Sequence, residues 1–192
     1  SARLGAAALT TTSRIAFTSN AGPRNSELYV VNADGSDKRL LARRVTPNSF
    51  SAAAWSPDGQ TIAVAGLFIN ADGSGQRNVA REWGLDGVPV WSPDGRRIAF
   101  ESGRDECRGE IYVMNADGSG LRRLTRNGLA DGQPMWSPSG RRIAFVRYSR
   151  RGACGGWASD PGPTVQVMNA DGSGQRQLAL GSPLAWSLDH VG

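Results

Sequence analysis

The residues Trp91 to Thr125, WSPDGRRIAFESGRDECRGEIYVMNADGSGLRRLT, contain one complete structural unit of this chain. Three apolar runs of strand length occur in it, at 97–101, 110–115 and 121–125. Turn signals flank these runs: Ser-Pro-Asp-Gly precedes the first, and Asn-Ala-Asp-Gly-Ser separates the second from the third. In such turns Pro fixes φ and Gly accepts the left-handed conformation. With the run that ends at Trp91 placed in front, the stretch predicts a sheet of four antiparallel strands.

The same pattern of residues is repeated along the chain. Trp-Ser recurs at Trp55, Trp91, Trp136 and Trp186, Asn-Ala-Asp-Gly-Ser begins at Asn32, Asn70, Asn115 and Asn169, and an Ile-Ala strand begins at Ile15, Ile62, Ile98 and Ile143. The tryptophans are 36, 45 and 50 residues apart, which is close to the period of repeats that each form a small sheet. Such a sheet cannot bury both faces alone, so copies stack around an axis. The sequence therefore predicts an all-β protein, a β-propeller of about four four-stranded blades.

These motifs resemble the TolB-like, WD-repeat-like propeller repeats. The resemblance rests on W-S-P-D-G, I-A-F, I-Y-V-M-N-A-D-G-S and R-x-L, and it extends from Arg14 to Ser187. That broad family includes periplasmic protein-interaction modules, the non-catalytic propeller halves of prolyl-oligopeptidase-like enzymes, and free-standing propellers. The resemblance therefore implies the fold and leaves the function open.

The repeats predict a single domain over 14–192, preceded by a loose N-terminal segment at 1–13. The expected repeats are 14–45, 51–80, 87–125 and 132–180, followed by a closing strand at 183–187. Regular structure is expected to begin with the second strand of a blade, because Arg14 directly precedes an Ile-Ala-Phe segment. The chain ends with the missing piece, Pro-Leu-Ala-Trp-Ser, which matches an innermost strand.

Pairing of Pro183–Ser187 with Arg14–Ser19 would complete the first blade, either within one chain or across two. Three assemblies follow from this pattern: a ring closed by one chain, an eight-bladed ring made by two chains, and an open arc docked on another molecule.

A shortened second blade bears on the choice between these assemblies. Only Gly66-Leu67-Phe68-Ile69 separates Thr61–Ala65 from the next turn. The expectation is one long strand over 61–70, or a blade with fewer strands and an exposed edge.

The fourth repeat contains the strongest functional signal, an insertion at 149–163 that reads SRRGACGGWASDPGP. Long insertions on one face of a repeat array commonly carry function. Trp157, Arg150 and Arg151 are therefore predicted to bind a ligand, together with Arg104 from the neighbouring loop and the non-repeat Trp83. The alternative is that the insertion plugs the channel or covers a sheet edge. The repeated tryptophans are expected to pack between blades, with sugar stacking as the alternative.

Cys107 and Cys154 are the only two cysteines, and both lie in second-to-third strand loops of adjacent repeats. Their separation matches no zinc-binding spacing, so a disulfide between them is predicted, with free thiols as the alternative. A disulfide indicates an oxidising, extracytoplasmic compartment, here a periplasmic or secreted location of bacterial type. No metal site and no cofactor are predicted. The Asn-Ala-Asp-Gly-Ser segments place oxygen ligands as a calcium loop does, but the same residues are the ones that a tight turn requires, and the turn interpretation is favoured.

Charge and motif content argue against several classes of function. The net charge is +5, but the arginines lie singly or in pairs at repeat positions, which is typical of solvated strand edges and not of nucleic-acid binding. No apolar run is long enough to span a membrane. The only histidine is His190, and no Gly-x-Ser-x-Gly motif occurs. The loop carboxylates Asp105, Glu106 and Glu110 leave a glycosidase-type pair as a third hypothesis, although solvated loop charges explain them more simply.

The sequence thus predicts a non-catalytic, extracytoplasmic propeller that binds a protein partner or assembles with itself. The alternative is a carbohydrate- or polyanion-binding propeller that uses the face of the 149–163 insertion. An enzyme with loop carboxylates is the third hypothesis.

Overall fold

The fold is all-β wherever the computed structural model describes it, at 13–20, 26–43, 45, 53–64, 66–78, 88–103, 109–148, 162–181 and 185–187. The first sheet contains β1 (Arg14–Asn20), β2 (Ser26–Asn32) and β3 (Arg39–Arg43), and the second contains β4 (Ala54–Trp55), β5 (Thr61–Val64), β6 (Leu67–Asn70) and β7 (Arg77–Asn78). The third contains β8 (Val90–Trp91), β9 (Arg97–Ser102), β10 (Glu110–Asn115) and β11 (Arg122–Arg123), and the fourth contains β12 (Ala130–Trp136), β13 (Arg142–Tyr148), β14 (Thr164–Asn169) and β15 (Arg176–Leu180).

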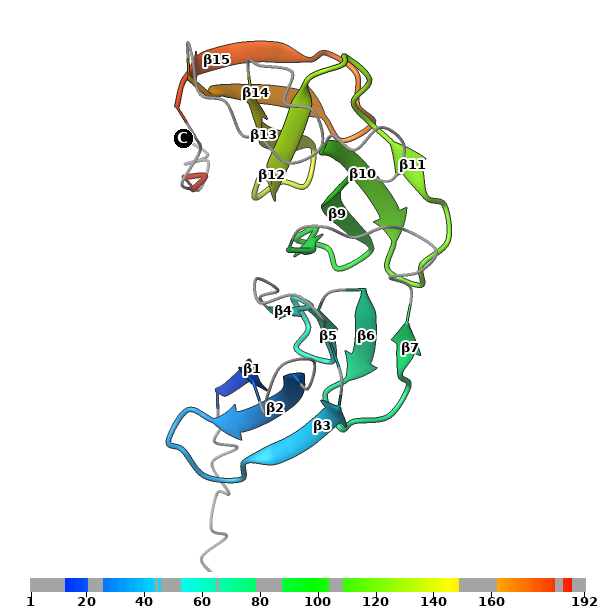
Figure 1. Cartoon of the computed structure of the whole chain (residues 1–192), viewed down its shortest axis with the longest axis vertical. Coiled ribbons are helices and arrows are strands. Elements are labelled where there is room, and N and C mark those ends of the chain that lie inside the picture. Colours follow the sequence, from blue (N-terminus) through cyan, green and yellow to red (C-terminus); the bar gives the residue numbers. More distant parts are fainter. Residues whose placement is uncertain are drawn as a thin grey trace, which may run out of the picture.

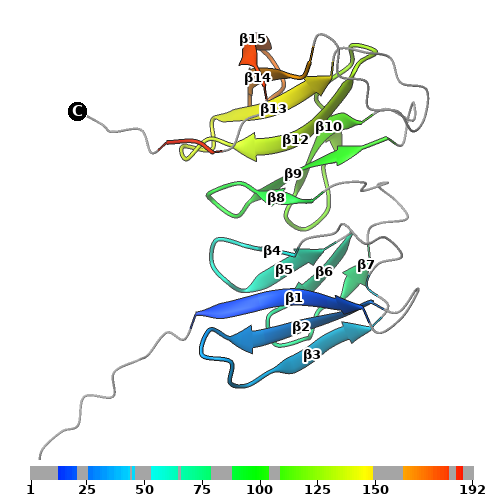
Figure 2. The same ribbon diagram turned by 60° about the vertical axis from the view of Figure 1, so that its left-hand side comes forward.

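All pairings within these sheets are antiparallel, and the sheets follow one another as the blades of an arc (Figure 1). The strands β4 and β12 lie on the concave side of the arc, and β7, β11 and β15 lie on the convex side (Figure 1). Figure 2 shows the same stack of sheets from another direction, with the β1 sheet at one end and the β15 sheet at the other. The predicted β-propeller fold with four blades is confirmed.

The hydrophobic core lies between the blades, because each blade buries alternate side chains against its two neighbours. The first interface packs Leu28, Val30 and Leu41 against Ile62, Val64 and Ile69. The second interface packs Ala63 and Phe68 against Ile98, Phe100, Tyr112 and Met114, and the third packs Ile111, Val113 and Leu124 against Trp136, Ile143, Phe145 and Met168. Face-to-face packing therefore replaces a single central core.

The turn chemistry follows the repeated motifs. In the Asn-Ala-Asp-Gly-Ser segment of the third blade, Asp117 Oδ1 accepts hydrogen bonds from the backbone N–H of Ser119 at 2.8 Å and from its hydroxyl at 2.7 Å. Gly118 has a φ of 90°, a backbone conformation that residues with a Cβ rarely adopt. Asp34, Asp72 and Asp171 make the same contacts. The aspartates are thus used by the turn itself, as the turn interpretation predicts.

The repeated tryptophans join neighbouring blades through their indole nitrogens. Trp91 Nε1 donates to the carbonyl of Ala54 at 3.2 Å, and Trp136 Nε1 donates to the carbonyl of Val90 at 3.1 Å. In each case the acceptor directly precedes the tryptophan of the previous blade. The prediction that the repeated tryptophans pack between blades is confirmed for Trp91 and Trp136, whereas Trp55 Nε1 is buried without a hydrogen-bond partner.

The second blade corrects one prediction. It has four strands, and β5 and β6 form a tight hairpin in which Val64 is opposite Leu67. Gly66 makes this turn with φ of 80°, so neither one long strand over 61–70 nor a missing strand is needed. Both expectations for this segment were wrong, because a glycine with positive φ allows a two-residue connection between β5 and β6.

Closure of the ring within one chain is also corrected. Among the described residues the first sheet has the order β1-β2-β3, and no strand pairs with the other edge of β1. Instead, Trp186 Nε1 donates to the carbonyl of Met135 at 3.2 Å. This is the contact that a following blade makes, so residues 185–187 occupy the position of the first strand of a fifth blade and the arc is open (Figure 1).

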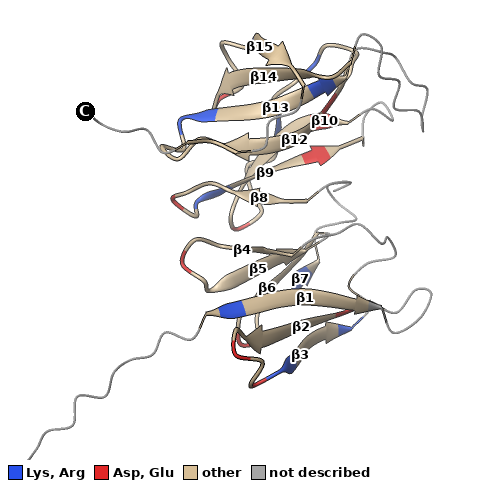
Figure 3. Ribbon diagram, turned by 90° about the vertical axis from the view of Figure 1, so that its left-hand side faces the viewer, with Lys and Arg blue, Asp and Glu red and all other residues tan. Residues whose placement is uncertain are grey.

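The tight turns at 33–36, 57–60, 71–74, 93–96, 116–119, 138–141 and 170–173 lie at one end of the sheets, called the turn face below (Figure 3). The opposite strand ends, among them Ser102, Glu110 and Tyr148, form the other end of the sheets, called the loop face. None of the described residues belongs to a helix that is long and apolar enough to cross a membrane.

Candidate functional site

The predicted ligand-binding residues Trp157, Arg150, Arg151, Arg104 and Trp83 lie outside the described residues, as do Cys107 and Cys154. The predicted disulfide and ligand contacts therefore stay predictions. The structure does describe the strand ends from which the loops at 103–109, 124–129 and 149–163 emerge. These ends of the third and fourth blades form a buried polar framework at the loop face.

The first part of the framework is centred on Glu110, the first residue of β10. Its carboxylate is 1% exposed and accepts a charge-assisted hydrogen bond from Arg123 Nη2 at 2.7 Å. The Thr125 hydroxyl donates to the other carboxylate oxygen and accepts from the backbone N–H of Ile111 at 3.0 Å. Arg123 Nε also donates to the carbonyl of Thr125 at 2.7 Å. These contacts fix the chain where it leaves β11 for the fourth blade.

The second part is centred on Asp131 in β12, which is fully buried. Arg147, at the end of β13, donates to both carboxylate oxygens at 2.8 and 2.9 Å. Asn127 Nδ2 donates to Asp131 Oδ2 at 2.6 Å, and the Asp131 backbone N–H donates to the carbonyl of Gly109 at 2.6 Å. The bidentate arginine pair orients Asp131, and the last bond ties the fourth blade to the loop of the third.

A third carboxylate, that of Glu101, lies against the backbone of Gly109 and Gly132. A Cβ added at either glycine would lie too close to this carboxylate, so a larger residue there would force the Glu101 side chain to move. Just beyond Gly132, β12 has a bulge, and Gln133 has φ of 52°. Its exposed side chain donates to the Tyr148 hydroxyl at 3.0 Å. A non-glycine residue in this conformation is strained, and such strain clusters at functional positions.

The electrostatics of the framework favour a structural role for its carboxylates. Burial raises the pKa of Glu110, while Thr125 and Arg123 oppose that effect and the nearby Asp131 adds to it. Glu110 is engaged by Arg123 and Thr125, and Asp131 by Arg147 and Asn127. Neither the Glu110 carboxylate nor the Asp131 carboxylate is accessible to solvent as a free acid or base. The expectation that Glu110 is a solvated loop charge was wrong, because the fourth blade covers it; Asp105 and Glu106 lie outside the described residues.

Metal binding finds no support in the part of the chain that the structure describes. No group of three or more His, Cys, Asp or Glu residues there has an arrangement that could hold a metal ion. The turn aspartates are engaged by serines, and those hydrogen bonds lower the pKa of Asp34, Asp72 and Asp171, with the serine hydroxyl as the largest cause.

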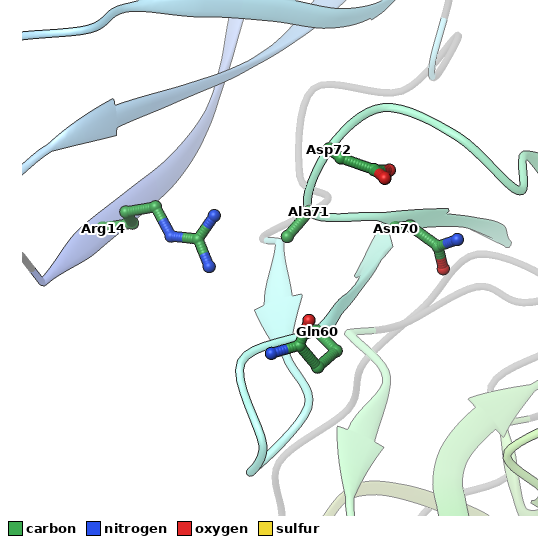
Figure 4. A pocket seen from close by; sticks show the side chains of 5 residues that line it. All are labelled: Arg14, Gln60, Asn70, Ala71 and Asp72. Atoms are coloured by element: carbon green, nitrogen blue, oxygen red, sulfur yellow. The ribbon is translucent and has the colours of Figure 1, made fainter. Parts of the chain in front are cut away.

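A polar pocket of about 300 Å³ lies at the turn face between the first two blades. Arg14, Gln60, Asn70, Ala71 and Asp72 line it, and they come from β1, from the β4–β5 turn, from the end of β6 and from the β6–β7 turn (Figure 4). The Arg14 guanidinium donates to the carbonyl of Gly59 at 3.3 Å and lies 5.3 Å from the centre of the Trp55 ring. Asp72 is bonded to Ser74. Arg14 therefore joins the first blade to the second, and Asp72 is used by its own turn.

Sequence reasoning missed most of the framework. Asp131, Arg147 and Gln133 were not singled out, because they lie in segments that read as ordinary strand and turn. The usable signals were a charged residue opening an apolar strand at Glu110 and the Gly-Gln-Pro segment after Asp131, which is unusual inside a strand. Neither signal reveals its partner, because each partner is 13 to 16 residues away.

Comparison with known proteins agrees with the architecture. Residues 6–181 match the family model described as the TolB beta propeller domain. The chain is 31% identical over 88 residues to the Tol-Pal system protein TolB of Alcanivorax borkumensis, a match that covers 41% of this chain and 20% of that protein.

Two solved structures are similar along most of the chain. A TolB-like protein from Agrobacterium tumefaciens has a TM-score of 0.64 and 27% identity, over 85% of this chain and 60% of that one. TolB from Acinetobacter baumannii has a TM-score of 0.61 and 21% identity, over 86% of this chain and 41% of that one. The chain therefore spans only part of the length of these relatives.

The repeated motifs, the blade stacking through tryptophan, and a family match that covers most of the chain lead to one conclusion: this chain belongs to the TolB β-propeller domain family.

Proposed function

We propose that the chain is a non-catalytic protein-binding module of an extracytoplasmic compartment and that its contact surface is the loop face. Membership of the TolB β-propeller family supports the proposal, as does the likeness over 88 residues to a protein named for the Tol-Pal system. The whole relative is much longer than the matched region, so its partners are not transferred by name.

The observation that carries the proposal is the buried framework of Glu110, Arg123, Asp131 and Arg147. Burying charged groups is costly unless they are paired, and here each carboxylate is paired with an arginine and a neutral donor. The effect is to hold the strand ends beneath three loops in fixed positions. Recognition loops work best when a rigid scaffold positions them.

The framework also argues against the third hypothesis, an enzyme with loop carboxylates. Hydrolysis by a carboxylate pair requires one acid and one base that both reach the substrate. Glu110 and Asp131 are both buried, and each oxygen pair is already used by protein donors. The geometry suits a support for loops better than a reactive centre.

The binding residues proposed on this scaffold are Trp157, Arg150 and Arg151, with Arg104 and Trp83 contributing from neighbouring loops. Trp157 supplies an apolar anchor, and the arginines select a partner that carries carboxylates. The proposal includes the Cys107–Cys154 disulfide, which would stabilise the fold by about 3 to 4 kcal/mol through loop closure and which suits an oxidising compartment.

The test begins with immobilised chain, an extract of the source cells and identification of the retained proteins by mass spectrometry. The affinity of the retained protein is then measured for the wild type, for Trp157→Ala and for Gln60→Ala, a control at the turn face. Trp157→Ala is expected to weaken binding by about 1 to 3 kcal/mol, as for an interface hot spot, and to leave the melting temperature within a few degrees. Gln60→Ala is expected to bind as the wild type does.

Three results would contradict the proposal. Equal loss of affinity in Gln60→Ala would place the contact at the turn face. A large loss of thermal stability in Trp157→Ala with unchanged affinity would make the insertion a plug. Saturable binding on a glycan array, with no protein retained, would favour the carbohydrate- or polyanion-binding alternative.

A further inference from the structure

We infer that the Asn127-Gly128 pair is a modification site: Asn127 deamidates spontaneously, and the acid that forms breaks the contact between the 124–129 loop and the buried framework. The site lies at the loop face, where the chain passes from the third blade to the fourth. The inference concerns the framework itself and does not depend on what the loop face binds.

The sequence concentrates this reactivity at one position. Deamidation begins when the backbone nitrogen of the following residue attacks the side-chain amide carbon of asparagine. Glycine hinders this approach least, because it has no Cβ. Asn127 is the only asparagine in the sequence that is followed by glycine, whereas alanine follows the asparagine of each Asn-Ala-Asp-Gly-Ser segment.

The turn at this position requires both members of the pair. Gly128 has a φ of 72°, in the left-handed region that favours glycine. Asn127 Oδ1 accepts a hydrogen bond from the backbone N–H of Leu129 at 2.8 Å, which folds the side-chain amide back over the Gly128 peptide. Asn127 is exposed, so water has access to it. The contacts that build the turn therefore also hold the amide carbon on the side of the attacking nitrogen.

The reaction consumes only water. The Gly128 nitrogen forms a bond to the Asn127 amide carbon, the bond from that carbon to Nδ2 breaks, and Nδ2 leaves as ammonia with the proton of the Gly128 N–H. The five-membered imide that results then adds one water molecule at either of its two carbonyl carbons. One opening gives aspartate, and the other gives isoaspartate, in which the main chain runs through the former side-chain carbon.

The framework needs an amide at position 127. Asn127 Nδ2 donates to Asp131 Oδ2 at 2.6 Å, and Asp131 is fully buried. The same side chain accepts from Leu129, so it must offer one donor and one acceptor, which an amide does and a carboxylate does not. An acid at position 127 would keep the contact with Leu129 and would place a second carboxylate oxygen against Asp131, where the like charges repel each other.

The arginines near this contact are already paired. The charged groups around Asp131 come from four strands: Arg147 from β13, Arg123 from β11, Glu110 from β10 and Glu101 from β9. Arg147 donates to both Asp131 oxygens, and Arg123 donates to Glu110. Arg126, which precedes Asn127, is exposed and offsets a new charge only weakly through water. Deamidation would therefore add a fourth carboxylate beside two arginines that already have partners.

The first test follows deamidation in the native 192-residue chain. The protein is incubated at mildly alkaline pH, digested, and analysed by mass spectrometry for the gain of about 1 Da that accompanies conversion of an amide to an acid. Asn127 is expected to react at least about tenfold faster than Asn115, which precedes alanine in the same sample. Asn127→Gln is the matched control, since glutamine keeps the amide but would have to close a six-membered ring. Equal rates at Asn127 and Asn115, or an Asn127 that reacts only after unfolding in urea, would overturn the inference.

The second test measures whether the acid loosens the framework. Asn127→Asp reproduces the charge of the product, and Asn127→Ala removes the same contact with Asp131 without adding a charge. At neutral pH, Asn127→Asp is expected to raise the unfolding equilibrium constant in urea at least about tenfold over that of the wild type. The ratio of the unfolding constants of Asn127→Asp and Asn127→Ala is expected to fall at least about tenfold between about pH 7 and pH 4, because two adjacent carboxyls share a proton as the pH falls.

The direction of this pH dependence follows from the repulsion. A carboxyl whose pKa is raised in the folded state gives stability that is present at low pH and lost as the pH rises through that pKa. If Asn127→Asp does not fold, the aged wild type replaces it, with its melting temperature compared with its deamidated fraction. An Asn127→Asp variant as stable as the wild type, a ratio that is independent of pH, or an aged protein whose melting temperature stays constant as deamidation proceeds would each contradict the inference.

Discussion

Replacement of Trp136 and Trp55 by phenylalanine separates the energy of the hydrogen bond between blades from that of ring burial. Both tryptophans lie under an arginine, with Arg97 4.6 Å from the Trp136 ring and Arg14 5.3 Å from the Trp55 ring. Only Trp136 has an acceptor for its indole nitrogen. The two substitutions remove the same atoms from similar surroundings and differ mainly in this bond.

The expected magnitudes follow from these contacts. Trp136→Phe loses a hydrogen bond of about 1 kcal/mol, leaves the Val90 carbonyl without its donor, and weakens the cation–π contact and the packing, for a total of about 2 to 3 kcal/mol. Trp55→Phe loses packing and cation–π energy but removes an unsatisfied donor, for a net cost of about 0 to 1 kcal/mol. The difference of about 2 kcal/mol corresponds to roughly 4 to 8 °C in melting temperature for a chain of this size.

The assay is urea and thermal denaturation followed by circular dichroism. Equal destabilisation by Trp55→Phe and Trp136→Phe, within about 0.5 kcal/mol, would refute the reasoning that only the Trp136 indole nitrogen has an acceptor.

The remaining predictions concern the carboxylates. Glu110→Ala removes the carboxylate partner of the buried Arg123 and is expected to cost about 3 to 5 kcal/mol in urea denaturation. Arg39→Ala removes an exposed pair with Asp37 and is expected to cost under about 1 kcal/mol; similar costs would contradict the buried framework. Carboxyl titration followed by NMR is expected to place the pKa of Glu110 above 4.5, mainly because of burial, and that of Asp94 below 3.8, mainly because of the Ser92 hydroxyl. A carboxyl whose pKa is lowered in the folded state gives stability that is lost as the pH falls through that pKa, so the turn aspartates predict acid destabilisation. A carboxyl whose pKa is raised gives stability that is lost as the pH rises through that pKa. Glu110→Gln is therefore expected to remove this opposite contribution, which is visible as a changed slope of the unfolding free energy against pH between about pH 4 and 7.

Short-range residue patterns were enough to predict the blades. A strand of the Ile98–Phe100 type alternates its side chains between two faces, and the Asp-Gly turns provide the positive φ that a tight reversal needs, so each hairpin is specified within about 40 residues. Four copies of that unit then require stacking, because one small sheet cannot cover its own faces. A backbone carbonyl of the neighbouring blade could also be expected as the acceptor for a repeated tryptophan, because a buried indole N–H needs a hydrogen-bond partner.

Tertiary structure decided the features that depend on partners far apart in the chain. The hairpin at Gly66 depends on one positive φ, which glycine can adopt but does not have to adopt. The framework at the loop face joins Glu110 to Arg123 and Asp131 to Arg147, and a carboxylate in a strand pattern does not say whether a neighbouring blade will cover it. Placement of Trp186 beside Met135 and away from β1 depends on the curvature accumulated over four interfaces. Each local motif is compatible with a closed or an open arc, and only the sum of the packing between blades selects one.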